Sequence, residues 1–168
     1  MDYEIKFLEK DAIEKVGNDE NAKAMIDKDN LVLASAFAMI TPDNNILDKW
    51  NVNYFNGVTG ELTNFLVAHD SVAHIETSKR VHTTEVNSID MSNVVIPITK
   101  ILSIAMDKSE LEYPHEPNKI FITLHHNDEY KNECWTITLF STNLFLYKIK
   151  IDAITGKTIS SEVKHLLK

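Results

Sequence analysis

The stretch that decides the fold is residues 135–161, WTITLFSTNLFLYKIKIDAITGKTISS. Apolar and polar side chains alternate over residues 135–140 and again over 145–151, which is the period of a half-buried strand. Three polar residues separate the two runs, so the sequence predicts an antiparallel pair. Asp152 and Gly156 then bracket a tight turn, because an Asp side chain accepts backbone N–H bonds and Gly tolerates a positive φ.

A looser copy of this pattern begins eighty-five positions earlier, at Trp50. Residues 50–55 alternate with period two, residues 61–68 return as a second strand, and a polar turn follows at 69–71. We therefore expect an α+β fold of two tandem units, each a helix plus a three- to four-stranded antiparallel sheet.

The boundaries of the two units follow from a stretch in which apolar residues do not recur at the spacing of a helix or a strand. We expect a first unit at residues 1–76, a connection at 77–91 and a second unit at 92–168, with one compact domain as the alternative.

Helical spacing of apolar residues predicts a first helix over residues 2–16 that ends at Gly17. Asn18 or Asp19 is expected to cap a second short helix. In the second unit, Asp90 or Ser92 is the expected cap of a longer helix.

Several strands and loops complete this prediction. Residues 31–40 are apolar on both alternating faces, which favours a central strand covered on both sides, with a helix as the alternative. We also expect a strand at 120–124, a polar loop at 125–132, a short closing strand at 157–160 and a terminal helical turn at 162–168.

The second half resembles a PepSY-like unit. The matching segments are residues 120–124 (IFITL), 135–139 (WTITL) and, above all, 146–156 (LYKIKIDAITG). The first half is similar only as a weak tandem copy, because it lacks the Asp-x-x-Thr-Gly turn. The resemblance implies a small non-catalytic module, in a family that often lies outside the cytoplasm and is proposed to bind or inhibit peptidases or to modulate attached domains.

The net charge of −8 lies mostly in the first half, where 14 acidic residues stand against 8 basic ones. No cluster of Lys and Arg suits phosphates, so nucleic acid is not an expected partner. The N-terminus lacks the basic and apolar parts of a signal peptide, and the apolar run at 31–40 is too short to span a membrane. We expect a cytoplasmic protein, with a removed leader on a longer precursor as the alternative.

The histidines do not predict a metal site. His125 and His126 adjoin two acidic residues, but neighbouring residues of a strand point to opposite faces, so they would chelate together only in a loop. His69 and His74 lack the spacing of a metal motif and are expected at a surface turn. No metal and no cofactor are therefore expected.

Cys134 is the single cysteine, so it forms no internal disulfide and no Cys-based zinc site. We expect an inert, half-buried thiol. Trp50 and Trp135 are expected to pack under the helices rather than line a ligand groove.

No catalytic constellation is recognisable, so no catalytic or binding residue is assigned and the protein is not expected to be an enzyme. The leading hypothesis is a non-catalytic module that binds a protein or peptide, with an inhibitory or regulatory role. The alternative is an acidic cytoplasmic immunity or inhibitor protein that neutralises a basic toxin, since its charge would speed encounter with a cationic partner.

Overall fold

The computed structural model describes residues 2–79 and 86–167. In chain order the elements are β1 (Glu4–Ile5), α1 (Glu9–Asn18), α2 (Glu20–Asp29), β2 (Val32–Ile40), β3 (Ile46–Leu47), β4 (Lys49–Phe55), β5 (Glu61–Ala68), β6 (Ser71–Lys79), a 3-10 helix (Met91–Asn93), α3 (Ile98–Glu112), β7 (Pro117–Asn127), β8 (Asn132–Ser141), β9 (Phe145–Asp152) and β10 (Thr158–His165). The class is α+β, as expected. Part of the expected connection, residues 80–85, lies outside the described residues.

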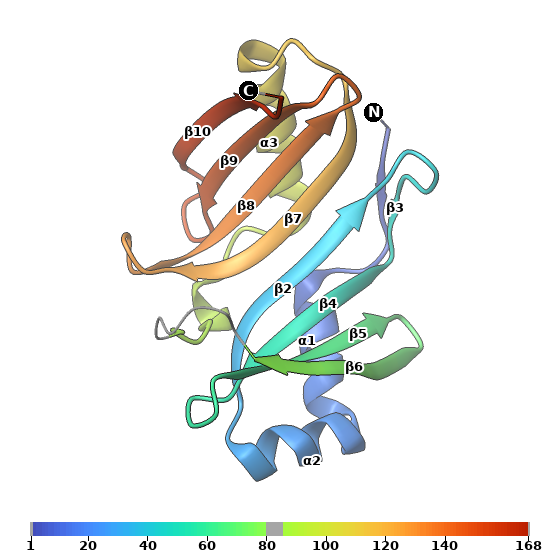
Figure 1. The fold of residues 1–168 in the computed structure, drawn as a ribbon, viewed down its shortest axis with the longest axis vertical. Coiled ribbons are helices and arrows are strands. Elements are labelled where there is room, and N and C mark those ends of the chain that lie inside the picture. The colour runs from blue at the N-terminus through green and yellow to red at the C-terminus, as the bar shows by residue number, and fades with distance from the viewer. Residues whose placement is uncertain (1, 80–85, 168) are drawn as a thin grey trace.

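Eight strands form one antiparallel sheet in the order β10-β9-β8-β7-β2-β4-β5-β6 (Figure 1). The strands before and after the expected connection meet at one seam, where β2 pairs with β7. In that seam Ala36 lies opposite Leu124, and Ile40 lies opposite Ile120. The sheet is therefore continuous from β10 to β6. The short strands β1 and β3 form a separate parallel pair.

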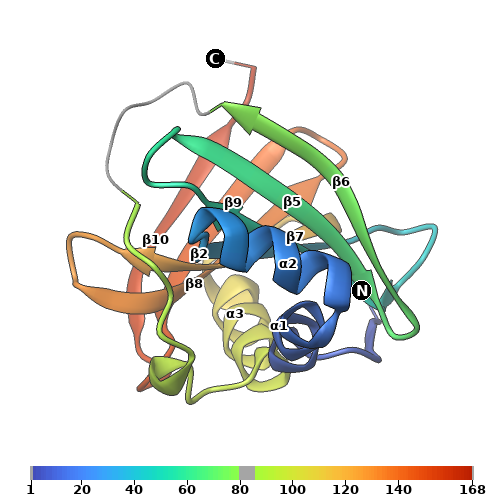
Figure 2. The same cartoon turned by 90° about the horizontal axis from the view of Figure 1, so that it is seen from below.

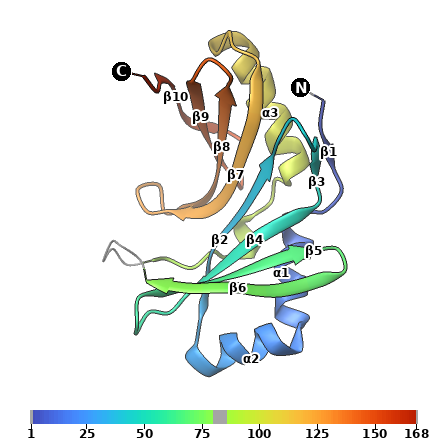
Figure 3. The same ribbon diagram turned by 45° about the vertical axis from the view of Figure 1, so that its right-hand side comes forward.

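The helices lie on one side of this sheet. Figure 2 shows α1 and α3 side by side beneath the strands, and Figure 3 shows the same arrangement from another direction. Ile98, Ile101, Leu102 and Ala105 of α3 are buried against the sheet, as expected of its apolar stripe. No helix of the described residues covers the opposite face, which we call the open face.

The core is centred on the two tryptophans. Trp50 of β4 and Trp135 of β8 are fully buried, and their ring centroids are 6.2 Å apart. The Trp50 Nε1–H donates a hydrogen bond of 2.9 Å to the carbonyl of Phe7, which ties the N-terminal segment to the sheet. Both residues pack under the helices, as the sequence predicted.

The turn that follows β9 is also confirmed. Asp152 Oδ1 accepts hydrogen bonds from the backbone N–H groups of Ile154 and Thr155, at 2.7 and 3.0 Å. Gly156 has a φ of 75°, which only glycine adopts without strain. Asp19 likewise caps α2 through a bond of 2.9 Å from the N–H of Ala22.

Helix starts were predicted too early. Residues 4–5 pair in parallel with β3, so the first helix begins only at Glu9, and it continues through Gly17 to Asn18. Asp90 caps a 3-10 turn rather than α3, which begins after Pro97. In the first case, residues that apolar spacing had assigned to the helix form a strand pair. In the second case, such residues form a 3-10 turn.

Three strand predictions are corrected as well. The expected loop at 125–132 is shorter and covers only residues 128–131, because β7 and β8 stay in register as far as Asn127 and Asn132. The expected helical turn at 162–168 is wrong, since β10 pairs with β9 up to His165. Coverage of residues 31–40 on both faces is wrong too, because the Met39 side of β2 lies on the open face and Met39 is 46% exposed.

Candidate functional site

The open face carries an apolar group where the sheet has no helix above it. The side chains come from alternate positions of three neighbouring strands: Phe37 and Met39 of β2, Phe121 of β7 and Phe140 of β8. We call these four residues the open-face patch. Their chain neighbours Ala38, Ile40, Ile120, Ile122 and Leu139 point to the other side and are buried in the core.

Strand register brings the patch together across the seam. Met39 lies opposite Phe121, and Phe37 lies opposite Thr123. The rings of Phe37 and Phe121 stack at a centroid distance of 5.9 Å with an interplanar angle of 23°. Phe121 also meets Phe140 edge to face at 5.0 Å. Three aromatic rings therefore form one contiguous group at the middle of the sheet.

This group is unusual for a surface. The three Phe side chains are half-buried rather than covered, and Met39 is exposed. Contiguous exposed apolar side chains on a soluble protein mark interaction sites more often than scattered single ones do. Their aromatic content matches the residue types that anchor protein interfaces.

Polar side chains border the patch along β4 and over part of the β9 side. On the β4 side, the Asn64 amide donates to Asn53 at 3.0 Å, and the Asn53 amide donates to Ser35 at 3.1 Å. On the β9 side, Thr138 of β8 lies opposite Phe121, with Thr136 in the next row, whereas half-buried Leu146 of β9 lies opposite Phe140 and continues the apolar group. An apolar centre with a polar rim is the arrangement found in protein interfaces.

Cys134 and His125 also lie on the open face, opposite each other on β8 and β7. Burial raises the pKa of the Cys134 thiol, although the positive charge of Lys150 acts against this. Burial likewise lowers the pKa of His125, whose Nε2 lies 2.8 Å from Thr136 Oγ1. No hydrogen bond among the described residues joins the thiol to the imidazole. The geometry keeps Cys134 as a buried thiol instead of activating it.

His126 points to the other side of the sheet, as neighbouring residues of a strand must. Its Nδ1 lies 3.1 Å from Glu133 Oε1, which also accepts a bond from the N–H of Asp90. Burial alone would raise the pKa of Glu133, but these hydrogen bonds hold it below its ordinary value. The role of this pair is to fasten the segment before α3. No group of three metal-ligating side chains occurs among the described residues.

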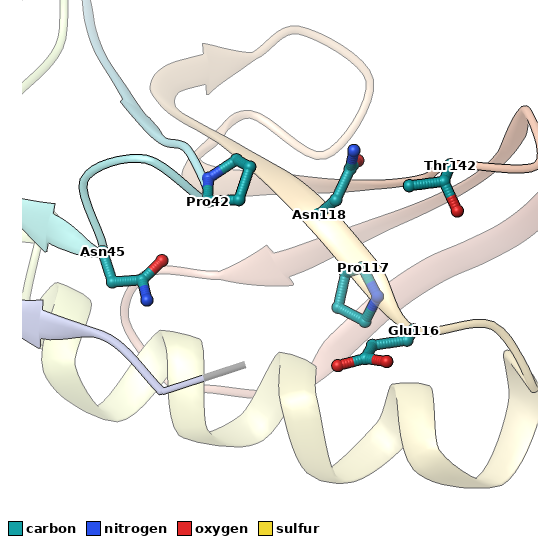
Figure 4. A pocket seen from close by; sticks show the side chains of 6 residues that line it. All are labelled: Pro42, Asn45, Glu116, Pro117, Asn118 and Thr142. Carbon is teal, nitrogen blue, oxygen red and sulfur yellow. The ribbon is translucent and has the colours of Figure 1, made fainter.

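A separate hollow lies at one end of the sheet (Figure 4). Pro42 and Asn45 come from the β2–β3 turn, and Glu116, Pro117 and Asn118 come from the start of β7, with Thr142 beyond them. Its volume is about 290 Å³. One carboxylate among prolines, amides and a hydroxyl gives no catalytic pair, and the hollow is at the lower limit of ligand pockets. We therefore place the candidate site on the open-face patch.

The sequence did not reveal this patch. A signal was present, because Phe37 and Met39 alternate with core residues and Phe121 does the same on its strand. That pattern was interpreted as a strand covered on both sides. The contact between Phe37 and Phe121 depends on the pairing of β2 with β7, which no local pattern specifies.

Comparison with known proteins identifies a fold but no family. No family model matches the chain, and no curated protein matches it. A solved structure that matches is that of a putative lipoprotein from Clostridium difficile 630, with a TM-score of 0.62 and 14% sequence identity. The match covers 98% of this chain and 96% of that chain. At this identity the likeness shows the fold alone.

The cytoplasmic location expected from the sequence is contradicted by this match, since lipoproteins are held at a membrane surface by a lipid. The expectation rested on the composition of the N-terminal segment and on the shortness of the apolar run at 31–40, and a lipid anchor requires no apolar span in the folded domain. Among the described residues, no helix is long and apolar enough to cross a membrane. We therefore do not propose a cytoplasmic immunity protein as the function of this chain.

Proposed function

We propose that this chain is a non-catalytic module that binds a protein or peptide across the open face of its sheet. The observation that carries the proposal is the contiguous aromatic group of Phe37, Phe121 and Phe140, which no helix of the described residues covers. Burying such rings supplies the hydrophobic part of an interface.

The shape of the sheet supports this use. In the part of the chain that the structure describes, the helices cover one face, and strands from both halves contribute to the other (Figures 1 and 2). Side chains on paired strands are held in register by the backbone ladder, so the patch is presented on a rigid support. A partner that covers the patch would exchange exposed apolar surface for buried surface without rearranging the fold.

We further propose that the chain consists of two tandem PepSY-like units, expected at residues 1–76 and 92–168 and joined by residues 77–91. Because β6 continues to Lys79, the first unit extends into the expected connection. Support comes from the element order, since helices precede four sequential antiparallel strands in each part. Trp50 and Trp135 occupy the second of those four strands in both. The proposal implies that the open-face patch lies at the junction of the two units.

The location proposed here is outside the cytoplasm, as a membrane-anchored or secreted protein. The likeness to the putative lipoprotein is its support. Such a location would offer extracytoplasmic proteins as partners, including the peptidases suggested by the PepSY-like resemblance.

The binding proposal is tested by affinity capture from the native host, with matched variants. Phe121→Ser removes the central ring of the patch, and Met39→Ser removes an exposed member with less effect on folding. Leu111→Ser is the control, because Leu111 is an exposed apolar residue on α3, away from the open face. We expect proteins captured by wild type and by Leu111→Ser to be lost with both patch variants. Capture that is unchanged in both would contradict the proposal.

A further inference from the structure

Charge is distributed unevenly over the two sides of the molecule. Although the chain carries −8 overall, residues 9–29, which form α1 and α2, hold seven acidic side chains against four basic ones. Both helices lie on the covered side of the sheet (Figure 2). On the open face, in contrast, β7 and β9 present Lys119, Lys148 and Lys150 beside the patch. The surface next to the aromatic rings therefore has the opposite sign from the chain as a whole.

Strand register fixes where these lysines stand. Lys148 lies opposite Thr138, which lies opposite Phe121. Lys150 lies opposite Thr136 in the neighbouring row. Each lysine is thus two strands away from the central strand β7, about 10 Å at the usual strand spacing.

The two lysines of β9 form no ion pair among the described residues, although Glu162 of β10 lines the same hollow. Glu162, opposite Lys148 on β10, forms its ion pair with Lys164 at 3.3 Å. This hollow of about 280 Å³, which Lys148 and Lys150 also line, lies between β9 and β10. Their field extends over the face, since after burial it is a further cause of the lowered pKa of His125.

From this arrangement we propose that the partner presents an acidic, extended peptide segment to the open face, with an apolar side chain on Phe121 and carboxylates at Lys148 and Lys150. The inference rests on the proposed function and names the chemistry of the partner. The basis of the inference is charge complementarity. A partner that buries the patch must bring its own neighbouring groups next to the ammonium groups of Lys148 and Lys150, and an acidic segment would pair with these ammonium groups instead of burying them unpaired.

An extended peptide also fits the dimensions. Side chains two residues apart on a strand project to the same side about 7 Å apart. A lysine side chain reaches several ångströms beyond its strand, so it spans the remaining distance to a carboxylate beside Phe121. The hydroxyls of Thr136 and Thr138 stand between, where they can donate to or accept from a peptide backbone. A lipid surface would use the same charges but not this row of hydroxyls.

The test uses fluorescein-labelled twelve-residue peptides and fluorescence anisotropy. The acidic probe repeats Glu-Ser-Phe-Ser, which places Glu and Phe two residues apart on the same side of an extended chain, and its counterpart repeats Lys-Ser-Phe-Ser with the same apolar residues. We expect the acidic probe to bind wild type at least about ten-fold more tightly than the basic one, and the preference to shrink as salt rises. In the Lys148→Glu/Lys150→Glu double variant the preference should reverse.

Lys23→Glu/Lys100→Glu is the matched control. It changes the net charge equally, at exposed lysines of α2 and α3 on the covered side, and we expect it to keep the acidic preference. Phe121→Ser should weaken both probes. Circular dichroism checks that each variant is folded.

Each other outcome is decisive. If Phe121→Ser weakens binding while the lysine reversal changes nothing, the acidic partner is refuted and the proposed function stands. If neither change has an effect, or if the acidic probe does not bind at millimolar concentration, the acidic partner is refuted as well. Binding to vesicles of three parts phosphatidylcholine to one part phosphatidylglycerol, lost on lysine reversal and without acidic-peptide binding, would assign the surface to an anionic membrane instead.

Discussion

The two core tryptophans offer a matched test of the hydrogen bond that anchors the N-terminal segment. Trp50 and Trp135 are both fully buried, on β4 and β8. Trp50 Nε1 donates to the Phe7 carbonyl at 2.9 Å, whereas Trp135 Nε1 is buried with no hydrogen-bond partner among the described residues. Replacing either tryptophan with Phe removes the same atoms, but only the substitution of Trp50 removes a hydrogen bond.

The magnitudes follow from these contacts. Either substitution loses about 2 kcal/mol of buried apolar surface and packing. Trp50→Phe also loses the net hydrogen bond and leaves a buried carbonyl unpaired, which adds about 2 kcal/mol. Trp135→Phe instead removes a buried donor that has no partner, which offsets about 1 kcal/mol or more of its cost. We therefore expect Trp50→Phe to be less stable than Trp135→Phe by about 3 kcal/mol.

The assay is equilibrium unfolding in urea followed by far-ultraviolet circular dichroism, because fluorescence changes when a tryptophan is removed. At this chain length a difference of about 3 kcal/mol corresponds to about 6–12 °C in Tm. Equal losses of unfolding free energy in the two variants would refute the reasoning, since the Phe7 bond would then contribute nothing beyond the shared packing.

Three further predictions concern the fold and its titratable groups. Burial raises the pKa of the Glu9 carboxyl, so its ionised form opposes folding and the unfolding free energy should fall as pH rises through that pKa. We expect Glu9→Gln to be more stable than wild type by about 1 kcal/mol at pH 8 and equally stable at pH 4, as measured by urea unfolding at each pH. Gly156→Ala should cost about 1 kcal/mol, because its φ is 75° and a Cβ would meet only the terminal carbon of Ile104, at the ordinary contact distance of 3.4 Å. Gly60→Ala, with the same φ in open space, should cost the same, and a clearly larger loss of unfolding free energy in Gly156→Ala would show that Ile104 cannot yield. Cys134 should resist iodoacetamide in the native state and react in urea, as followed by mass spectrometry; rapid native labelling would show that the thiol is not buried.

Local pattern was sufficient for the parts of the fold held by neighbouring contacts. The alternation around Trp135 and Trp50 predicted β8 and β4, and the turn from Asp152 to Gly156 was specified by its own side chain and its own φ. The cap at Asp19 was readable for the same reason. In each case the stabilising bonds join residues close in sequence.

The incorrect predictions concern elements whose structure depends on pairing with segments that are distant in sequence. β1 forms because residues 4–5 find β3 some forty positions away, against the helical spacing of their apolar residues. β10 extends to His165 because β9 offers it a ladder, although its own sequence is mostly polar. The open-face patch is of this kind as well, since its rings come from three strands that meet only through the seam between β2 and β7.

The central claim, that the open face is the binding surface, is tested most directly by site-specific photo-crosslinking in the native host. Benzoylphenylalanine is placed at Met39, an exposed member of the patch, and in a parallel protein at Leu111 on α3. Covalent adducts to a distinct protein from position 39, absent from position 111 and lost when Phe121→Ser is added, are the predicted result. Adducts from position 111 alone, or adducts from position 39 that persist with Phe121→Ser, would contradict the claim.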